Sequence, residues 1–292
     1  MQQLEEKVVQ PVIEQPWLDQ VGRPIQDFLN GLFHGSEIGL RIKDFLNGTW
    51  LAHPVHPMVT DVAVGAWTTA LVLDGVESAS GQDMGAASST AVGVGIAGAA
   101  ASAASGLADW SDTYADQRRM GLLHAITNTL ALGLYGASLW RRLSGHRTSG
   151  KALSGAGFAT LMVGAYLGGD LAYRLGTQVD RNAHIQGPRG YTPVMKEADL
   201  PPNRPTKVEV GGVPVLLVRQ GGAIFALSDI CSHQGCSLSE GRIQDSSIVC
   251  SCHGSTFNLS DGAVLHGPSP YAQPTYDVRV ANGQIQVRAA QQ

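Results

Sequence analysis

The sequence predicts a multidomain chain in which a four-helix α-helical transmembrane bundle is followed by a small all-β domain. Between residues 58 and 176, long apolar stretches of membrane-spanning length follow one another. From residue 207 onward, short apolar runs alternate with Gly-Gly and Asn-Gly turns, which is typical of β-strands. All four cysteines fall between residues 231 and 252, so the two parts also differ in chemistry.

Composition and charge exclude some functions. The chain has 292 residues, which exceeds one average domain. Its formal net charge is -4, and no run of Lys and Arg with interleaved aromatic residues occurs. Because proteins that bind nucleic acid need a basic surface, we expect no nucleic-acid partner.

Residues 1–50 form a predicted amphipathic N-terminal region. The pentapeptide Asp-Phe-Leu-Asn-Gly occurs at residues 27–31 and again at residues 44–48. We predict two short amphipathic helices, each ended by Asn-Gly, because Gly commonly follows a helix C-terminus. These helices either lie flat on a membrane surface or pack against each other, and we expect them to pack against each other.

The predicted membrane domain covers residues 51–176. Three of its segments, 84–108, 120–140 and 152–169, contain no Asp, Glu, Lys or Arg. A helix needs roughly 20 such residues to cross a bilayer, so we predict helices at about 58–76, 84–108, 120–140 and 152–175. The first carries Asp61 and Asp74, which we place near its ends, where a carboxylate reaches the headgroups. The alternative is a soluble Ala-rich bundle, since residues 84–108 are only mildly hydrophobic.

Four spans put both chain termini on the same side of the cell membrane. The basic residues near the helix ends do not decide which side. Five of them lie on the side of the termini and four on the other: Arg41, Lys43, Arg118, Arg119 and Arg174 against Arg141, Arg142, Arg147 and Lys151.

Residues 177–206 contain five prolines and no periodic apolar pattern, so we predict a linker there. The all-β domain is predicted over residues 207–292. Its motifs are Cys231-Ser-His233 and Cys250-Ser-Cys-His253. Each motif offers one thiolate and one imidazole, which is the ligand set of a [2Fe-2S] cluster held by two Cys and two His. A zinc site is the alternative, but zinc fingers place two cysteines close together in one loop.

These motifs resemble those of the Rieske family over roughly residues 206–289. The resemblance implies that Cys231 and Cys250 bind the iron that stays Fe(III), and that His233 and His253 bind the iron that is reduced. It also implies a disulfide between Cys236 and Cys252, as in one subgroup of the family. Two free buried thiols are the alternative.

The resemblance extends to residues around the cluster. Ser255 corresponds to the family hydroxyl that donates a hydrogen bond to cluster sulfur, and Pro268 belongs to a segment resembling the family's proline loop. Phe257 stands where high-potential members often have Tyr, so one hydrogen bond to a cysteine sulfur is absent and the potential is lowered. We expect an intermediate value within the about -150 to +300 mV range of such centres. Gln234 replaces an apolar residue that shields the cluster in quinol-oxidising complexes.

The stretch 46–67, with His53-Pro-Val-His56-Pro, resembles the signature of an uncharacterised four-helix bacterial membrane domain that is sometimes fused to a Rieske domain. By helix geometry, His53, His56, Asp61 and His124 fall near one membrane surface. A site for haem, quinone or a metal is one interpretation. We favour the other, a rigid turn that starts the first membrane helix and whose histidines form hydrogen bonds to Asp61 or Asp109. His34, His146, His184 and His266 are predicted to lie in loops.

We therefore expect a membrane-bound Rieske iron-sulfur protein that carries single electrons between a donor and an acceptor. A redox protein or a quinone is the expected partner, with no catalytic residues of the chain's own. The alternatives are a quinol-oxidising respiratory subunit and a non-catalytic redox sensor or assembly factor. A Rieske oxygenase is not expected, because residues 254–292 contain no set of two His and a carboxylate for a second iron.

Overall fold

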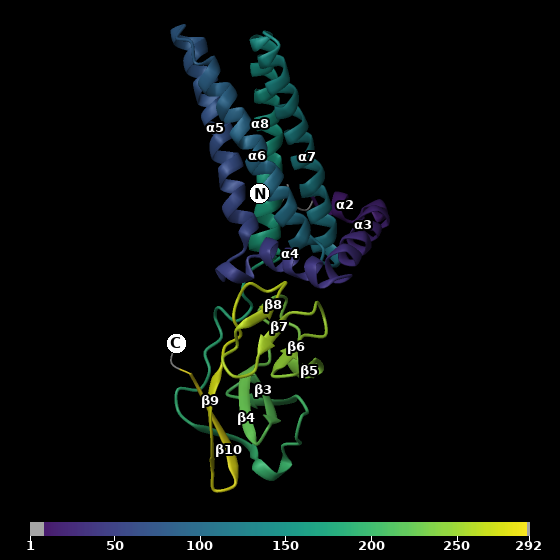
Figure 1. The fold of residues 1–292 in the computed structure, drawn as a ribbon, viewed down its shortest axis with the longest axis vertical. Coiled ribbons are helices and arrows are strands. Elements are labelled where there is room, and N and C mark those ends of the chain that lie inside the picture. The colour runs from purple at the N-terminus through teal and green to yellow at the C-terminus, as the bar shows by residue number, and fades with distance from the viewer. Residues whose placement is uncertain (1–8, 291–292) are drawn as a thin grey trace. The chain divides into compact units, whose positions relative to one another are not determined.

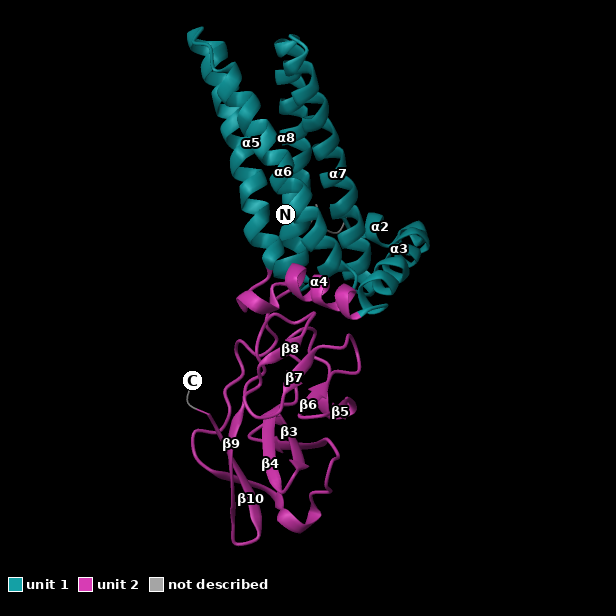
Figure 2. Ribbon diagram, viewed as in Figure 1, with its two compact units in different colours: residues 1–36, 55–177 teal, residues 37–54, 178–292 magenta. Residues whose placement is uncertain are grey.

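The computed structural model describes residues 9–290. The chain divides into two compact units, which Figure 2 colours separately. The helical unit consists of residues 1–36 and 55–177, and the β unit consists of residues 37–54 and 178–292. The predicted fold class is confirmed, since four long apolar helices precede an all-β region.

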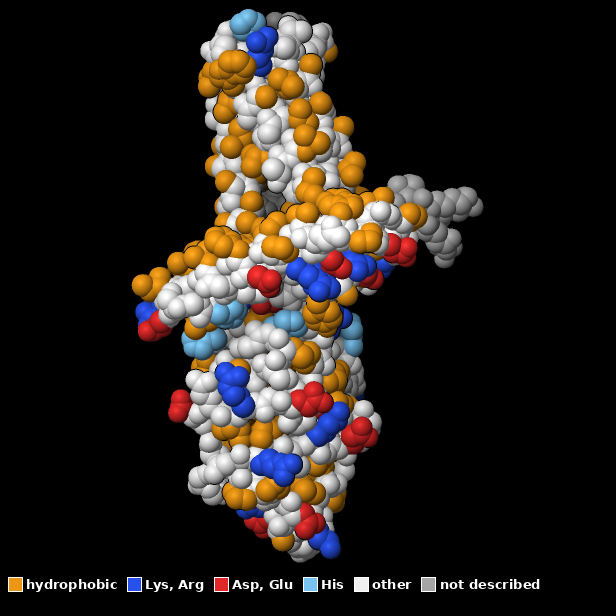
Figure 3. All heavy atoms as spheres, turned by 90° about the vertical axis from the view of Figure 1, so that its right-hand side faces the viewer, with side chains coloured by type: hydrophobic (Ala, Val, Ile, Leu, Met, Phe, Trp, Pro, Cys, Tyr) orange, Lys and Arg blue, Asp and Glu red, His pale blue; other side chains and the backbone are white. Residues whose placement is uncertain are grey.

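The helical unit contains a bundle of four long helices, drawn side by side in Figure 1. They are α5 (Val55–Ser80), α6 (Gly85–Trp110), α7 (Ala115–Leu143) and α8 (Arg147–Gly169), and a π-helical turn (Asp170–Arg174) continues α8. All four are long and apolar enough to cross a membrane, yet only 22% to 33% of their most apolar windows is buried inside the protein. The visible outer face of the bundle carries many hydrophobic side chains and few charged ones (Figure 3), which is the surface expected against lipid.

The bundle core is built on close helix packing. The rings of Trp67 and Tyr135 stack with centroids 4.0 Å apart. A Cβ at Gly95 would lie 2.2 Å from the Trp67 indole nitrogen, and a Cβ at Gly157 would lie 3.0 Å from the Tyr135 ring. Glycines at these positions therefore let the aromatic side chains fit between the helices.

Asp74 was predicted to reach the lipid headgroups, and the structure shows that this prediction is wrong. Its carboxylate is buried inside the bundle and forms a two-pronged ion pair with Arg142, with Nη1 2.9 Å from Oδ1. Ser88 also donates a hydrogen bond to it, at 2.7 Å. A charged group away from water needs such partners. The bundle therefore has a polar interior site near the C-terminal end of α5. Asp61, by contrast, is exposed on α5.

Within residues 9–54, two helices of the helical unit precede the bundle, α2 (Gln10–Ile13) and α3 (Pro16–His34). The predicted first amphipathic helix does not end at Asn30-Gly31, because α3 continues to His34. Its polar side chains bind the turn between α6 and α7. Gln26 donates to the carbonyl of Trp110 at 2.7 Å, and Asn30 donates to that of Ser111 at 3.0 Å.

The β unit begins with α4 (Glu37–Asn47) and a 3-10 turn (Thr49–Leu51). Gly48 follows α4 with φ of 84°, so the second Asn-Gly pair does end a helix. Three antiparallel sheets follow, with strand orders β1-β10-β9, β2-β3-β4 and β5-β6-β7-β8. The strands are β1 (Thr192–Lys196), β2 (Thr206–Val210), β3 (Val213–Gln220), β4 (Ala223–Ser228), β5 (Arg242–Gln244), β6 (Ser247–Val249), β7 (Thr256–Asn258), β8 (Val264–His266), β9 (Tyr276–Ala281) and β10 (Gln284–Ala289).

The segment predicted as a linker, residues 177–206, is largely part of the β unit. Thr192–Lys196 pairs with β10 as an edge strand, and Pro193 lies at the point where the register shifts. Asn182 accepts a hydrogen bond from Ser228 (2.7 Å) and donates one to the carbonyl of Ile230 (2.8 Å). The strand was not predicted because its proline is typical of a linker and because the segment has no alternating apolar pattern. Proline is nevertheless tolerated in edge strands and at bulges.

Candidate metal centre

Two loops with the same backbone fold form the candidate site, residues 231–236 and 250–255. In each loop the first residue is a cysteine and the fifth is a glycine with positive φ, 81° and 80° respectively. The glycine N–H donates to the cysteine carbonyl, at 2.9 Å in the first loop and 3.1 Å in the second. The cysteine N–H donates to the carbonyl of the sixth residue, at 2.8 and 2.9 Å. The loops are therefore equivalent turns that present two cysteines in the same way.

Cys231 and Cys250 are free, and each is only 2% exposed. Backbone N–H groups donate to both sulfurs, from residues 233 and 234 to Cys231 and from residues 252 and 253 to Cys250. The two thiols also share a hydrogen bond, which lowers the pKa of Cys250 to about 6 and, together with burial, raises that of Cys231 well above its usual value. Backbone donors aimed at both sulfurs suit thiolates that bind a metal.

His233 and His253 belong to the same two loops as the free cysteines, and their ring centroids lie 5.0 Å apart with ring planes at 90°. His233 is 3% exposed, and its Nδ1 has no hydrogen-bond partner among the described residues. Burial lowers the pKa of His233 well below its usual value and lowers that of His253 to about 4. Both imidazoles are therefore neutral near pH 7, which is the form that binds metals.

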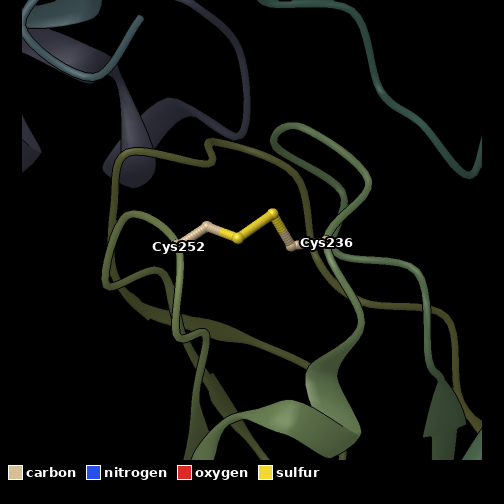
Figure 4. The surroundings of a disulfide bond; sticks show 2 residues. All are labelled: Cys236 and Cys252. Carbon is tan, nitrogen blue, oxygen red and sulfur yellow. A yellow bond between two sulfur atoms is a disulfide. The ribbon is translucent and has the colours of Figure 1, made fainter. Parts of the chain in front are cut away.

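A disulfide joins the two loops (Figure 4), so the predicted bond between Cys236 and Cys252 is confirmed. The sulfurs of Cys236, Cys250 and Cys252 lie within 4.8 Å of one another. Three sulfurs at that spacing resemble a metal site, but two of them are oxidised to the disulfide and offer no thiolate. Cys250 is the member of this group that remains free to bind a metal, and it lies next to the bridge.

A third loop covers the site and includes Pro268, which is buried. The Ser269 N–H donates to Ser255 Oγ at 3.1 Å. Because Ser255 Oγ accepts this bond, its own O–H remains a donor for another acceptor. Ser269 Oγ also lies 2.8 Å from Ser232 Oγ, so the third loop contacts both cysteine loops.

Two family models match the chain. Residues 190–277 match the Rieske [2Fe-2S] domain, and residues 52–181 match a family described as Predicted membrane protein (DUF2231). A ferredoxin subunit of 3-phenylpropionate/cinnamic acid dioxygenase from Escherichia coli (strain K12) is 35% identical over 89 residues, which are 83% of that protein and 30% of this chain. The chain belongs to the Rieske [2Fe-2S] domain family. It also carries the DUF2231 membrane domain, and its cofactor is therefore a [2Fe-2S] cluster.

Other relatives match the Rieske domain alone. The anthranilate 1,2-dioxygenase ferredoxin subunit of Burkholderia cepacia is 31% identical over 85 residues, 79% of its length and 29% of this chain. The cytochrome b6-f complex iron-sulfur subunit of Chlorobaculum tepidum is 37% identical over 76 residues, 26% of this chain, so the chain spans 41% of that subunit. The solved ferredoxin of carbazole 1,9a-dioxygenase from Nocardioides aromaticivorans is 31% identical, with 98% of its chain and 34% of this chain covered and a TM-score of 0.33.

Phe257 and Gln234 occupy different positions around the Rieske site. Phe257 is fully buried on β7 and shares one hydrophobic cluster with Cys231 and Cys250. The Gln234 side chain accepts a hydrogen bond from the Arg181 guanidinium at 3.3 Å. An apolar ring therefore lies beside the cysteines, and a polar amide with a basic partner lies beside His233.

Sequence reasoning missed two basic residues near the site, Arg181 and Lys43. Both add positive charge that lowers the pKa of His233, and Lys43 does the same to His253. The Arg181 N–H donates to the carbonyl of Ser232 at 3.2 Å. Neither residue lies in a motif, since one is in the segment predicted as a linker and the other is on an amphipathic helix.

The membrane-face histidines are only partly brought together. His56 and His124 lie with ring centroids 6.2 Å apart. The Nδ1 of His56 donates to the carbonyl of Ser102 (2.8 Å), and the Nδ1 of His124 donates to that of Gly164 (2.9 Å). His53 is exposed and bonds to the carbonyl of Pro54. The histidines therefore bond to backbone carbonyls, whereas Asp61 and Asp109 were the predicted partners. A haem or quinone there stays a prediction.

Proposed function

We propose that this protein is a membrane-bound Rieske electron carrier in which Cys231, Cys250, His233 and His253 hold the cluster. One observation carries the assignment. Two equivalent loops each present a free, buried cysteine beside a neutral imidazole, and the buried Nδ1 of His233 has no other partner among the described residues. A buried polar atom without a partner is costly unless a ligand completes it.

When bound, the cluster supplies one-electron oxidation and reduction at a potential set by its protein surroundings. The chain's own groups tune that potential. Backbone N–H groups of residues 233, 234, 252 and 253 point at the cysteine sulfurs and stabilise negative charge on them. Lys43 and Arg181 add positive charge near the histidines. These groups favour the reduced state, whereas the apolar ring of Phe257 offers no hydrogen bond.

The relatives and the site both favour a role in electron transfer. Several relatives are ferredoxin subunits of dioxygenases, and one is a subunit of the cytochrome b6-f complex. Their shared property is single-electron transfer, which we extend to this chain. Gln234, bound to Arg181, places a polar side chain where quinol-oxidising members carry an apolar shield, so we propose a carrier between two redox partners.

The membrane setting follows from the helical unit. The four candidate spans leave most of their apolar surface exposed, and Arg142 pairs with Asp74 inside the bundle. We infer that the protein spans the cell membrane four times, with both termini on the same side. The Rieske domain is then anchored to the membrane by the chain itself.

Low-temperature EPR and visible spectroscopy with a redox titration test the proposal on detergent-purified full-length protein. A rhombic signal should appear on one-electron reduction, and Cys231→Ser or His233→Ala should abolish it. His184→Ala is the matched control, because His184 is an exposed histidine of the same unit that belongs to neither cysteine loop, and this variant should keep the signal. Absence of the signal from wild-type protein, with zinc bound instead of iron, would contradict the proposal.

A further inference from the structure

Helix α4 has two unlike faces. Ile38, Ile42 and Phe45 follow one another at helical spacing and are 71%, 50% and 60% exposed. Gly39, Lys43 and Asn47 occupy the opposite face at intervals of four residues, and all three are buried. A helix with a continuous exposed apolar stripe requires an apolar partner, because such surface is costly to leave in water.

The buried face of α4 is attached to the Rieske domain by Asp44. One carboxylate oxygen accepts a hydrogen bond from the Nδ1–H of His266 at 2.9 Å, and the other accepts one from the N–H of Gly267 at 2.8 Å. A Cβ on Gly267 would lie 3.1 Å from the Asn47 side chain, so the helix and this loop are in close contact. His266 was predicted to lie in a loop, but it ends strand β8.

This attachment lies on the histidine side of the Rieske domain. Gly267 precedes Pro268 and Ser269, whose N–H binds Ser255 in the second cysteine loop. Lys43, one residue before Asp44, is 2% exposed, so this face of the helix is covered by protein. Helix α4 therefore covers the same side of the domain that presents the two imidazoles.

Chain connectivity puts α4 at the level of the membrane surface. Only residues 48–54 separate Asn47 from the start of the candidate span α5 at Val55. Seven residues reach at most about 25 Å when fully extended, and here part of that length is coiled in a 3-10 turn. Trp50 in this turn is 60% exposed and stacks on Phe45, with ring centroids 5.7 Å apart. Aromatic residues at the end of a span are typical of the membrane interface.

Helix α3 shows the same design independently. Its exposed apolar residues also recur at helical spacing, and they are Trp17, Val21, Ile25, Phe28 and Leu32. Its opposite face binds the first turns of the candidate span α7, where Asp19 forms ion pairs with Arg118 and Arg119. Two successive helices thus each bind protein through polar groups and leave an apolar stripe uncovered.

We propose that α4 lies in the lipid headgroup layer on its Ile38, Ile42 and Phe45 face, and that Asp44 holds the histidine side of the Rieske domain at the membrane surface. This replaces our expectation that the N-terminal amphipathic helices pack against each other. The consequence of this proposal rests on the proposed function. The electron partner meets the cluster at the membrane surface, and this partner is a membrane-bound or membrane-dissolved molecule.

Site-directed fluorescence tests the lipid contact without needing the cluster. Full-length Ile42→Cys and Arg41→Cys proteins are labelled with an environment-sensitive dye and placed in bilayers that contain brominated lipids. Wild-type protein treated with the same dye shows how much label the native thiols take up. We expect several-fold stronger quenching at residue 42 than at the neighbouring polar position 41. Equal quenching at the two positions overturns the proposal, whatever the cluster does.

EPR on oriented membrane multilayers tests the attachment through Asp44. The reduced wild-type signal should change strongly with the angle between membrane and field, and Asp44→Ala should remove most of that dependence. Glu37→Ala is the control, because Glu37 is exposed on the same helix and should leave the dependence unchanged. A wild-type signal that is present but independent of angle overturns this inference and leaves the proposed function intact. A missing signal overturns the proposed function, and the fluorescence result then decides the inference alone.

Discussion

The N–H of Ser269 donates a hydrogen bond to the hydroxyl oxygen of Ser255, at 3.1 Å, and so ties the covering loop to the second cysteine loop. Because the Ser255 oxygen is used as an acceptor, its O–H points elsewhere, and cluster sulfur is the acceptor that the site offers. This bond would stabilise the more negative, reduced state of the cluster.

Replacing Ser255 with Ala should lower the reduction potential. If the hydrogen bond stabilises the reduced state by about 1 kcal/mol more than the oxidised state, its loss lowers the potential by about 40 mV. This follows because about 59 mV corresponds to a tenfold change in the equilibrium constant of a one-electron step. A redox titration monitored by EPR measures the shift, with Ser260→Ala as control for an exposed serine. An unchanged or higher potential in Ser255→Ala would show that the hydroxyl does not donate to the cluster.

Replacing Phe257 with Tyr should shift the potential in the opposite direction. Phe257 is fully buried in the cluster of side chains that includes Cys231 and Cys250, so an added hydroxyl has a cysteine sulfur as a nearby acceptor. The expected rise is again about 40 mV for about 1 kcal/mol of preferential stabilisation. Thermal unfolding of the same variant checks that the larger ring is accommodated. A folded variant with a lowered potential would contradict the prediction.

Removing the disulfide should destabilise the Rieske domain. The bond joins Cys236 to Cys252, with a sequence separation of 16, and a loop of that size gives a stabilisation of about 3 kcal/mol in the chain-entropy account. The double variant C236S/C252S should unfold at lower temperature in calorimetry and lose iron faster. Equal stability of variant and wild type under oxidising conditions would argue that the two loops need no covalent restraint.

The ion pairs of Asp19 should make the helical unit pH-sensitive. Hydrogen bonds from Arg119 and Arg118 lower the pKa of Asp19 from 3.8 to about 2. A pKa lowered by folding adds stability above pH 3.8, and that stability is lost as the pH falls towards 2. Wild type should exceed Asp19→Asn in stability by about 1 kcal/mol at pH 6, after allowance for solvent screening. In detergent, the difference should shrink between pH 4 and 2, and a constant difference would exclude this origin.

Removing one partner of the interior ion pair should lower the stability of the bundle more than replacing both partners with apolar residues. Arg142 and Asp74 are almost fully buried, and removal of one partner leaves an uncompensated charge. Asp74→Ala should therefore lower the stability by about 3–5 kcal/mol, whereas the apolar double variant D74L/R142M should be much closer to wild type. Thermal unfolding in detergent makes the comparison. A double variant that is less stable than Asp74→Ala would contradict this account.

The features predicted from sequence are those encoded by local patterns. The spacing of Cys231, His233, Cys250 and His253 indicated the centre directly, and apolar stretches of membrane-spanning length, three of them free of charged residues, indicated the four spans. In the structure the rings of His233 and His253 lie 5.0 Å apart, and Cys231 and Cys250 are free and buried, while their binding of a cluster stays a prediction. Such patterns can be recognised because neighbouring residues within one loop or helix carry them.

The features that sequence reasoning missed join distant parts of the chain. Asp74 pairs with Arg142, 68 residues away, although its position near a predicted helix end suggested the headgroups. Asp44 binds His266, 222 residues away, and no motif marks either residue. Tertiary packing decides such pairs, so a single sequence without its three-dimensional structure does not reveal them.

Pulsed EPR on reduced full-length protein, with and without 15N-labelled histidine, tests the central claim most directly. The account predicts two iron atoms per chain and a rhombic signal coupled to two histidine nitrogens, with the coupling changing on 15N labelling. In His233→Ala and in His253→Ala, this two-nitrogen coupling should be lost. A reduced cluster whose signal shows no histidine nitrogen coupling, or a centre occupied by a single zinc ion, would contradict the account.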